Sequence, residues 1–110
     1  MPYEVYQKNE KNIPITIEDN DGALDISGTS IIFVVKNNEE VVIKKTIDDG
    51  ITIINAENGE IEIDITDEDN DIIPMGYDCE LLLIDAEGNR YTALQGKYVI
   101  EKSYTKDEVV

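Results

Sequence analysis

The sequence contains no histidine and no tryptophan, and Cys79 is its single cysteine. Without histidine there is no imidazole to act as a general base, to activate a serine or cysteine nucleophile, or to bind zinc or haem. A lone cysteine forms neither a metal-binding cysteine cluster nor an internal disulfide. These absences argue against an enzyme, and we expect no catalytic residue, no cofactor and no small-molecule substrate.

Basic residues are also scarce, because 9 Lys and Arg stand against 25 Asp and Glu, which gives a net charge of -16. Contacts to phosphate need Lys and Arg, so we expect neither nucleic acid nor an anionic membrane as a partner. No window approaches ~18 consecutive apolar residues, and the N-terminus lacks a basic region followed by an apolar stretch. We therefore expect no membrane span, no signal peptide, and synthesis in a reducing cytoplasm.

The apolar residues that are present are mostly β-branched, with 18 Ile and 8 Val against 5 Leu in 110 residues. Their stiff side chains suit a pleated sheet. Turn signals recur at short intervals, and no segment repeats apolar residues at the helical period. The sequence predicts one all-β domain over residues 1–110, an immunoglobulin-like β-sandwich of about seven to nine short, mostly antiparallel strands. Its core is expected over residues 12–102, with a flexible tail over 103–110.

Two predicted strands are candidates for contact with a partner. Ile13, Ile15 and Ile17 alternate with Pro14 and polar residues, which is typical of an edge strand with one buried face. Residues 31–35 are apolar on both faces, and so indicate a central strand or one that also contributes to an interface. Residues 41–47 are expected to pair with them as a hairpin.

Further along, Asn58-Gly59 lies between two alternating segments over residues 51–65 and predicts a hairpin with a type I′ turn. Thr66 and Asp69 are spaced to cap a single helical turn. A strand over residues 77–85 follows, and turns at Gly88-Asn89 and Gln95-Gly96 are expected to separate residues 91–94 from a last strand over 97–102.

Tyr77 precedes Cys79 by two residues at a predicted strand start, which is the spacing of the tyrosine corner of immunoglobulin-like sandwiches. On this strand Cys79 shares the inward face with Tyr77, Leu81 and Leu83, so we expect a small core residue. The other five tyrosines are expected at half-buried rim positions, with an aromatic interaction surface as the alternative.

Fourteen of the 25 acids lie between Lys45 and Arg90, where no basic residue occurs. They either keep an Ile-rich β protein soluble or mimic the phosphate surface of DNA to sequester a basic protein. Mimicry requires one continuous acidic surface. Within this segment, Asp67, Asp69 and Asp71 resemble the start of a calcium loop, but Ile72 and Asp78 occupy the positions where an EF-hand has Gly and Glu. They are weak metal candidates, and a solvated acidic loop is the main interpretation.

The order of these features resembles the immunoglobulin-like N-terminal domain of baseplate upper proteins and related tail proteins from phages and prophages of Gram-positive bacteria. The resemblance spans roughly residues 12–101 and rests on Ile13-Pro14-Ile15-Thr16-Ile17, residues 24–36, Gly50-Ile51-Thr52-Ile53, residues 58–63, residues 76–81 and residues 85–89. In that family the domain is a docking module that attaches a longer protein to the virion, with no catalytic residues. This sequence ends at Val110, so we expect a stand-alone virion or assembly component, or a relict prophage protein.

We therefore expect a non-enzymatic structural or docking module of a phage or prophage virion, made in the bacterial cytoplasm. Its expected partners are other virion proteins and copies of itself. The expected contact residues are Ile13, Ile15 and Ile17 at a sheet edge, or Ile32 and Val34 where one face of their strand is uncovered. The alternative function is the acidic DNA mimic.

Overall fold

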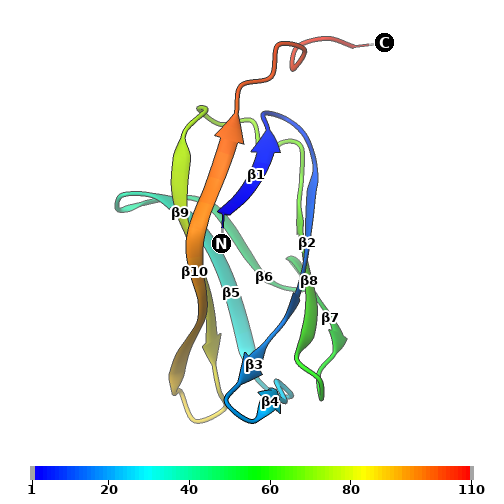
Figure 1. Ribbon diagram of the computed structural model, residues 1–110, viewed down its shortest axis with the longest axis vertical. Helices are drawn as coiled ribbons and strands as arrows, with labels where there is room; N and C mark the ends of the chain where they lie inside the picture. The colour runs from blue at the N-terminus through cyan, green and yellow to red at the C-terminus, as the bar shows by residue number, and fades with distance from the viewer. Residues whose placement is uncertain (1, 110) are drawn as a thin grey trace.

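The computed structural model describes the backbone of residues 2–109, and the regular elements found there are all β-strands. They are β1 (Pro2–Tyr6), β2 (Lys11–Thr16), β3 (Glu18–Asp19), β4 (Gly22–Ala23), β5 (Ser30–Asn37), β6 (Glu40–Ile47), β7 (Gly50–Asn55), β8 (Glu60–Ile65), β9 (Gly76–Ile84) and β10 (Arg90–Glu101) (Figure 1). The predicted all-β fold class is confirmed. In the described part of the chain no helix is long and apolar enough to cross a membrane.

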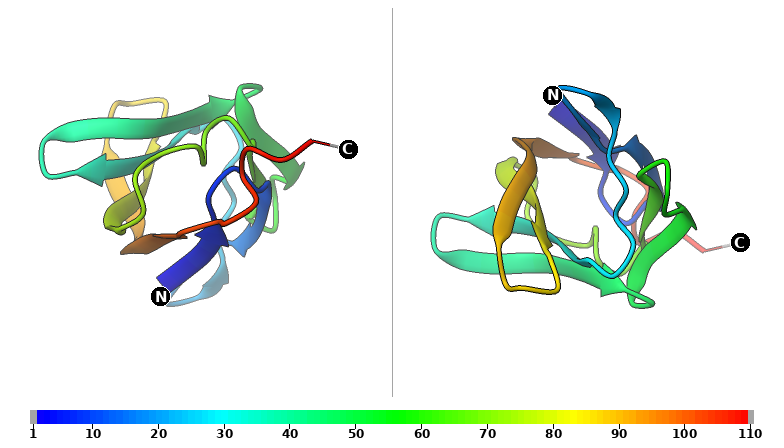
Figure 2. Two further views of the ribbon diagram at one scale, coloured as in Figure 1. Left: turned by 90° about the horizontal axis from the view of Figure 1, so that it is seen from above. Right: turned by 90° about the horizontal axis from the view of Figure 1, so that it is seen from below.

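Eight of the strands form one sheet in the order β1-β10-β9-β5-β6-β7-β8-β2, and β3 pairs separately with β4. The sheet folds over on itself between β6 and β7, which share only two residue pairs. The result is a layer of five strands, β1-β10-β9-β5-β6, packed against a layer of three, β7-β8-β2. Figure 2 shows this curled arrangement from both ends, with the β5–β6 hairpin projecting beyond the body.

The core lies between the two layers and is built by strict alternation along the strands. In β5, Ile31, Phe33 and Val35 are buried, whereas Ile32 and Val34 are only partly buried. The same alternation runs along β8 in one layer and β9 in the other, where every second residue is buried. The other buried hydrophobic residues are Val5, Ile13, Ile17, Ile26, Ile43, Ile51, Ile61, Ile63, Ile65, Tyr77, Cys79, Leu81, Leu83, Tyr98 and Ile100.

The hairpin predicted over residues 51–65 forms from β7 and β8, but the predicted type I′ turn is wrong. That turn needs positive φ at both central residues, and Gly59 takes φ of 68° while Asn58 is not among the residues with positive φ. The chain turns over Ala56–Gly59, where the Gly59 N–H donates to the Ala56 carbonyl. A Cβ at Gly59 would lie 2.5 Å from the Ile17 carbonyl oxygen, so this glycine serves a close backbone approach.

Two further differences concern the last strand and the first strand. The predicted turn at Gln95-Gly96 is wrong, because β10 runs unbroken from Arg90 to Glu101 and Gly96 pairs with Cys79 inside it. The strand β1 lies outside the predicted core range. It pairs in parallel with β10 at the edge of the five-stranded layer and buries Val5.

The tyrosine corner is confirmed by its geometry. Tyr77 opens β9 and is buried, and its hydroxyl donates a 2.6 Å hydrogen bond to the carbonyl of Ile73, four residues upstream. The corner lies where the chain passes from β8 in the three-stranded layer to β9 in the five-stranded layer. It therefore ties the crossing segment to the strand that follows.

The predicted capped turn at Thr66 is also present. The Asp69 N–H donates to Thr66 Oγ1 at 3.1 Å, and Asp69 Oδ2 accepts from the Thr66 N–H at 2.9 Å. Asp69 also binds Lys45 Nζ at 2.6 Å, and the Lys45 side chain is only 11% exposed. The stem of Lys45 runs over Gly50, where any added side chain would collide with it.

The next residue, Asn70, is fully buried and holds three segments together. Its side-chain nitrogen donates to the Asn9 carbonyl at 2.6 Å, its side-chain oxygen accepts from Tyr98 at 2.7 Å, and its carbonyl accepts from the Lys8 N–H. Tyr98 is thus a buried core residue and not the half-buried rim residue expected. Burial also raises the pKa of its hydroxyl, so Tyr98 stays a hydrogen-bond donor at physiological pH.

The corner hydrogen bond predicts that Tyr77→Phe lowers the free energy of unfolding by about 1 kcal/mol, because the Ile73 carbonyl loses its donor. Urea denaturation measures this effect. Tyr91→Phe is the matched control, since Tyr91 is 45% exposed, and it should change stability much less. Equal effects of the two substitutions would show that the corner bond contributes nothing.

The Lys45–Asp69 pair predicts a pH-dependent contribution to stability. Burial alone raises the pKa of the Asp69 carboxyl, but the hydrogen bonds from Lys45 and Thr66 and the charge of Lys45 outweigh it, and the net pKa is lowered. A lowered carboxyl pKa stabilises the fold above the ordinary value near 3.8 and loses that stabilisation as pH falls further.

Lys45→Met should therefore destabilise the protein at neutral pH, and the gap to the wild type should narrow between about pH 5 and 2. Urea denaturation across that range measures the gap. Lys97→Met, which removes an ion pair with both side chains more than 60% exposed, should show little gap at any pH. A gap for Lys45→Met that stays constant with pH would contradict the assignment.

Candidate functional site

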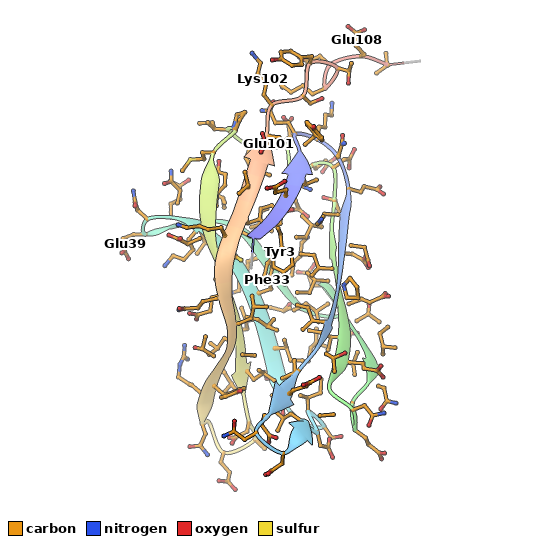
Figure 3. All side chains as sticks on the ribbon, viewed as in Figure 1. Tyr3, Phe33, Glu39, Glu101, Lys102 and Glu108 are labelled. Carbon is orange, nitrogen blue, oxygen red and sulfur yellow. The ribbon has the colours of Figure 1, made fainter. Side chains whose placement is uncertain are left out.

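The outer face of the five-stranded layer carries a group of apolar side chains on its central strands. Because Ile31, Phe33 and Val35 point into the core, Ile32 and Val34 point outward. The same alternation turns three more partly buried apolar residues outward, and these are Leu82 and Ile84 on β9 and Val99 on β10. Figure 3 shows Phe33 between the layers and Glu39 at the projecting tip of the β5–β6 hairpin.

Strand register makes four of these residues contiguous, whereas Val99 lies opposite Gly76 and Glu4, beyond the Asp78–Lys97 pair. Ile32 lies opposite Thr46 on β6 and Leu82 on β9, and Val34 lies opposite Lys44 and Glu80. We call the four residues Ile32, Val34, Leu82 and Ile84 the outer apolar face. A shallow hollow of about 580 Å³ adjoins it, lined among others by Val34, Gln95 and Gly96. Apolar side chains gathered on one exposed sheet face are typical of a surface that contacts another protein.

Two pairs of polar groups lie beside this face. Lys97 forms an ion pair with Asp78 across β9 and β10, and Gln95 donates to Glu80 at 2.7 Å. Strand residues on this side of the five-stranded layer comprise four bases and four acids: Lys36, Lys44, Arg90, Lys97, Glu4, Asp78, Glu80 and Glu101. The other 5 bases and 21 acids of the chain carry the whole net charge of -16. The outer apolar face therefore lies on an electrically balanced surface.

The outer side of the three-stranded layer is different in character. Glu60, Glu62 and Asp64 face outward from β8, and no base stands on this side among the strand residues that the structure describes. The two broad faces thus differ in charge and in apolar content.

Two of the predicted edge residues, Ile13 and Ile15, lie on β2, which is the last strand in the sheet order, as Pro14 indicated, and Ile17 follows directly after it. Ile13 and Ile17 are each 3% exposed and pack in the core, so only Ile15, which is partly exposed, has a side chain near the surface. The remaining contact candidates, Ile32 and Val34, belong to the outer apolar face. Sequence reasoning missed Leu82 and Ile84, although residues 81–84 are apolar on both faces in the same way as residues 31–35.

Each of the three aspartates of the acidic loop contacts a different group of the same chain. Asp69 binds Lys45 and Thr66, Asp67 accepts from the Glu68 N–H, and Asp71 pairs with Lys106 at 3.5 Å. Within residues 2–109, no three metal-ligating side chains converge on one point. The loop therefore acts in this structure as a polar connection between β8 and β9.

The 14 acids between Lys45 and Arg90 are spread around the molecule. Asp48 and Asp49 lie at the corner between the layers, Glu60, Glu62 and Asp64 on one face, and Asp78 and Glu80 on the opposite face. Asp67 to Asp71 and Asp85 to Glu87 lie in loops at the two ends of β9. This scattering does not make the single continuous surface that a DNA mimic requires.

Cys79 is buried on β9 and points away from the outer apolar face. Burial raises the pKa of its thiol, and only smaller effects of neighbouring charges and a backbone hydrogen bond oppose that rise. The thiol therefore stays protonated and behaves as a small core side chain.

The two unequal layers and the tyrosine corner define this chain as a small immunoglobulin-like β-sandwich domain. The family model of the BppU N-terminal domain, the N-terminal domain of phage baseplate upper proteins, matches residues 3–110. The chain belongs to this family, and the family resemblance suggested by its sequence is confirmed. Membership gives the chain a structural role in the phage virion.

The solved structures include a similar fold in the N-terminal domain of phage TP901-1 ORF48. The TM-score is 0.64 at 16% sequence identity, over 93% of this chain and 86% of that chain. The major subunit AggA of the aggregative adherence fimbriae type I of Escherichia coli also matches, with a TM-score of 0.33, 13% identity, and coverage of 91% of this chain and 89% of that chain. Its TM-score is too low to support an argument. Curated protein sequences contain no match to this chain.

Neighbouring leucines on β9 test whether the outer apolar face is separate from the core. Leu81→Ala removes a fully buried side chain and should lower the free energy of unfolding by about 2–5 kcal/mol. Leu82→Ala changes the same atoms on the opposite side of the strand and should cost about 1 kcal/mol or less. Urea denaturation of both variants measures the difference, and a large loss for Leu82→Ala would place that residue in the core.

Proposed function

We propose that this chain is a non-enzymatic docking module of a phage or prophage tail or baseplate. It is made in the bacterial cytoplasm and acts in the virion through protein–protein contacts. Its partners are other virion proteins and copies of itself. The observation that carries the proposal is the outer apolar face, where Ile32, Val34 and Leu82 stand side by side on two central strands.

Burial of this face favours docking. Each Ile, Val or Leu that passes from partly to fully buried contributes about 1 kcal/mol. Four such residues together offset about 4 kcal/mol, which is the lower estimate of the cost of losing translational and rotational freedom. The Lys97–Asp78 ion pair, the Gln95–Glu80 hydrogen bond and the other charged residues beside this face disfavour partners whose charges do not match them.

The placement of the reactive groups supports a non-enzymatic role. Cys79 is buried and protonated, and Asp69 is held by Lys45 and Thr66. Asp25 and Asp85 have lowered pKa values because each accepts hydrogen bonds within its own turn, from Ser27 and from Asn89. These groups all serve local structure.

The proposal predicts that Leu82→Glu prevents incorporation of the protein into virions, because a buried carboxylate without a partner disrupts an apolar contact. Ile54→Glu is the matched control. It makes the same chemical change at a residue that is 55% exposed on β7, in the other layer. Mass spectrometry of purified virions measures the amount of the protein, with thermal unfolding to show that both variants fold. Normal incorporation of folded Leu82→Glu would overturn the proposed docking face.

A further inference from the structure

The charge distribution narrows the choice of partner for the outer apolar face. The chain carries -16 in total, yet the strand residues on this side of the five-stranded layer balance at four bases and four acids. A second copy of so acidic a chain is repelled wherever two acidic surfaces meet. Two balanced faces meet without that local repulsion.

We infer that the outer apolar face is covered by the same face of a second copy of this chain, in a two-fold, face-to-face pair. This inference rests on the proposed function, because it names the partner of the docking face. A two-fold interface uses one surface patch twice, so the patch must complement itself. An apolar centre in a face of zero net charge meets that requirement, because neither copy presents an excess of one sign to the other.

The size of the face fits a reversible pair. Four of the five strands in that layer, spaced about 4.8 Å apart and about 26 Å long, present on the order of 500 Å², which includes the outer apolar face and the polar residues around it. Two copies would then bury on the order of 1,000 Å² in total, which lies at the lower limit for a specific interface. We therefore expect association at micromolar to millimolar concentration, and on the virion a high local concentration favours it further.

The face-to-face arrangement also separates the most acidic surfaces. Glu60, Glu62 and Asp64 lie on the outer side of the three-stranded layer, away from the contact. With sheets stacked about 10 Å apart, the two acidic layers of a pair stand about 30 Å apart. That distance is about three to four Debye lengths at physiological salt, so little of their repulsion remains.

Light scattering on the purified chain tests the inference, from about 10 μM to 1 mM protein and from about 0.05 to 0.5 M NaCl. We expect a reversible monomer–dimer equilibrium whose dissociation constant falls as salt rises, because salt screens the repulsion between two acidic chains. A monomer at every concentration and salt would overturn the inference. Association that weakens with salt would also overturn it, since that is the behaviour of an acidic face docked on a basic one.

Two substitutions at one position separate the alternatives. In a face-to-face pair, Leu82→Glu and Leu82→Lys should each weaken dimerisation by about tenfold or more, because either charge is buried against an apolar partner. In a head-to-tail arrangement, the outer apolar face of one copy would instead meet the acidic outer side of the three-stranded layer of the next copy. Leu82→Lys would then strengthen association. Ile54→Glu has the same charge change as Leu82→Glu on the opposite layer and should leave the dissociation constant within about twofold.

The virion measurement separates failure of this inference from failure of the proposed function. If the wild type stays monomeric in solution while Leu82→Glu is lost from virions, the outer apolar face docks on a different virion protein and only the second copy is refuted. If the chain dimerises through this face but Leu82→Glu still enters virions, the proposed docking role fails. Val34→Lys repeats each measurement at a second position, in case Leu82→Glu does not fold.

Discussion

The structure depends on the burial of one side of a single sheet against itself. With one side chain in two directed inward, β-branched residues can fill the space between the layers only if the sheet folds over. The sheet bends between β6 and β7, where the pairing of the two strands falls to two residue pairs. Because five strands lie on one side of the fold and three on the other, the two broad faces have different sizes and different chemistry. The neutral apolar face and the acidic face both follow from that division.

A second constraint acts at the end of the sandwich where β10 finishes. Asn70 bridges the turn after β1, the loop after β8 and the inward row of β10 through its backbone and side chain. Gln7 extends the same network, because its side chain donates to the Ile72 carbonyl and accepts from the Ser103 N–H. Buried polar groups satisfied in this way favour one arrangement of the segments they join. The parallel edge strand β1 is held in place partly by this network.

The sequence predicted the features that depend on local pattern. Alternating isoleucines identified β2 and β8, Pro14 identified an edge, and the spacing of Tyr77 from Cys79 identified the corner. It failed where distant contacts decide the outcome. Gly96 looked like a turn residue but lies in a strand, because every residue of β9, from Gly76 to Ile84, has a partner on β10. Tyr98 and Asn70 appear polar in isolation, and each is buried because the other satisfies it.

The same limit applies to the candidate site. Ile32 and Val34 were identifiable because their strand is apolar on both sides, and Leu82 and Ile84 show the same signal. Which side of such a strand is covered depends on how many strands lie in each layer, and that is a property of the whole fold. For this reason Ile13 and Ile17, at the edge, proved to be core residues. Charge balance on one face depends in the same way on which strands become neighbours.

The position of Pro14 has a consequence for how copies of this chain add to one another. It lies in the middle of β2, the last strand of the sheet. Proline has no backbone N–H, so at this position β2 cannot donate a hydrogen bond to a carbonyl of an incoming strand. At the opposite end of the sheet, β1 is only five residues long and has Glu4 at its centre. Both edges therefore resist extension by further strands, and open-ended fibrils are disfavoured even where many copies are crowded together.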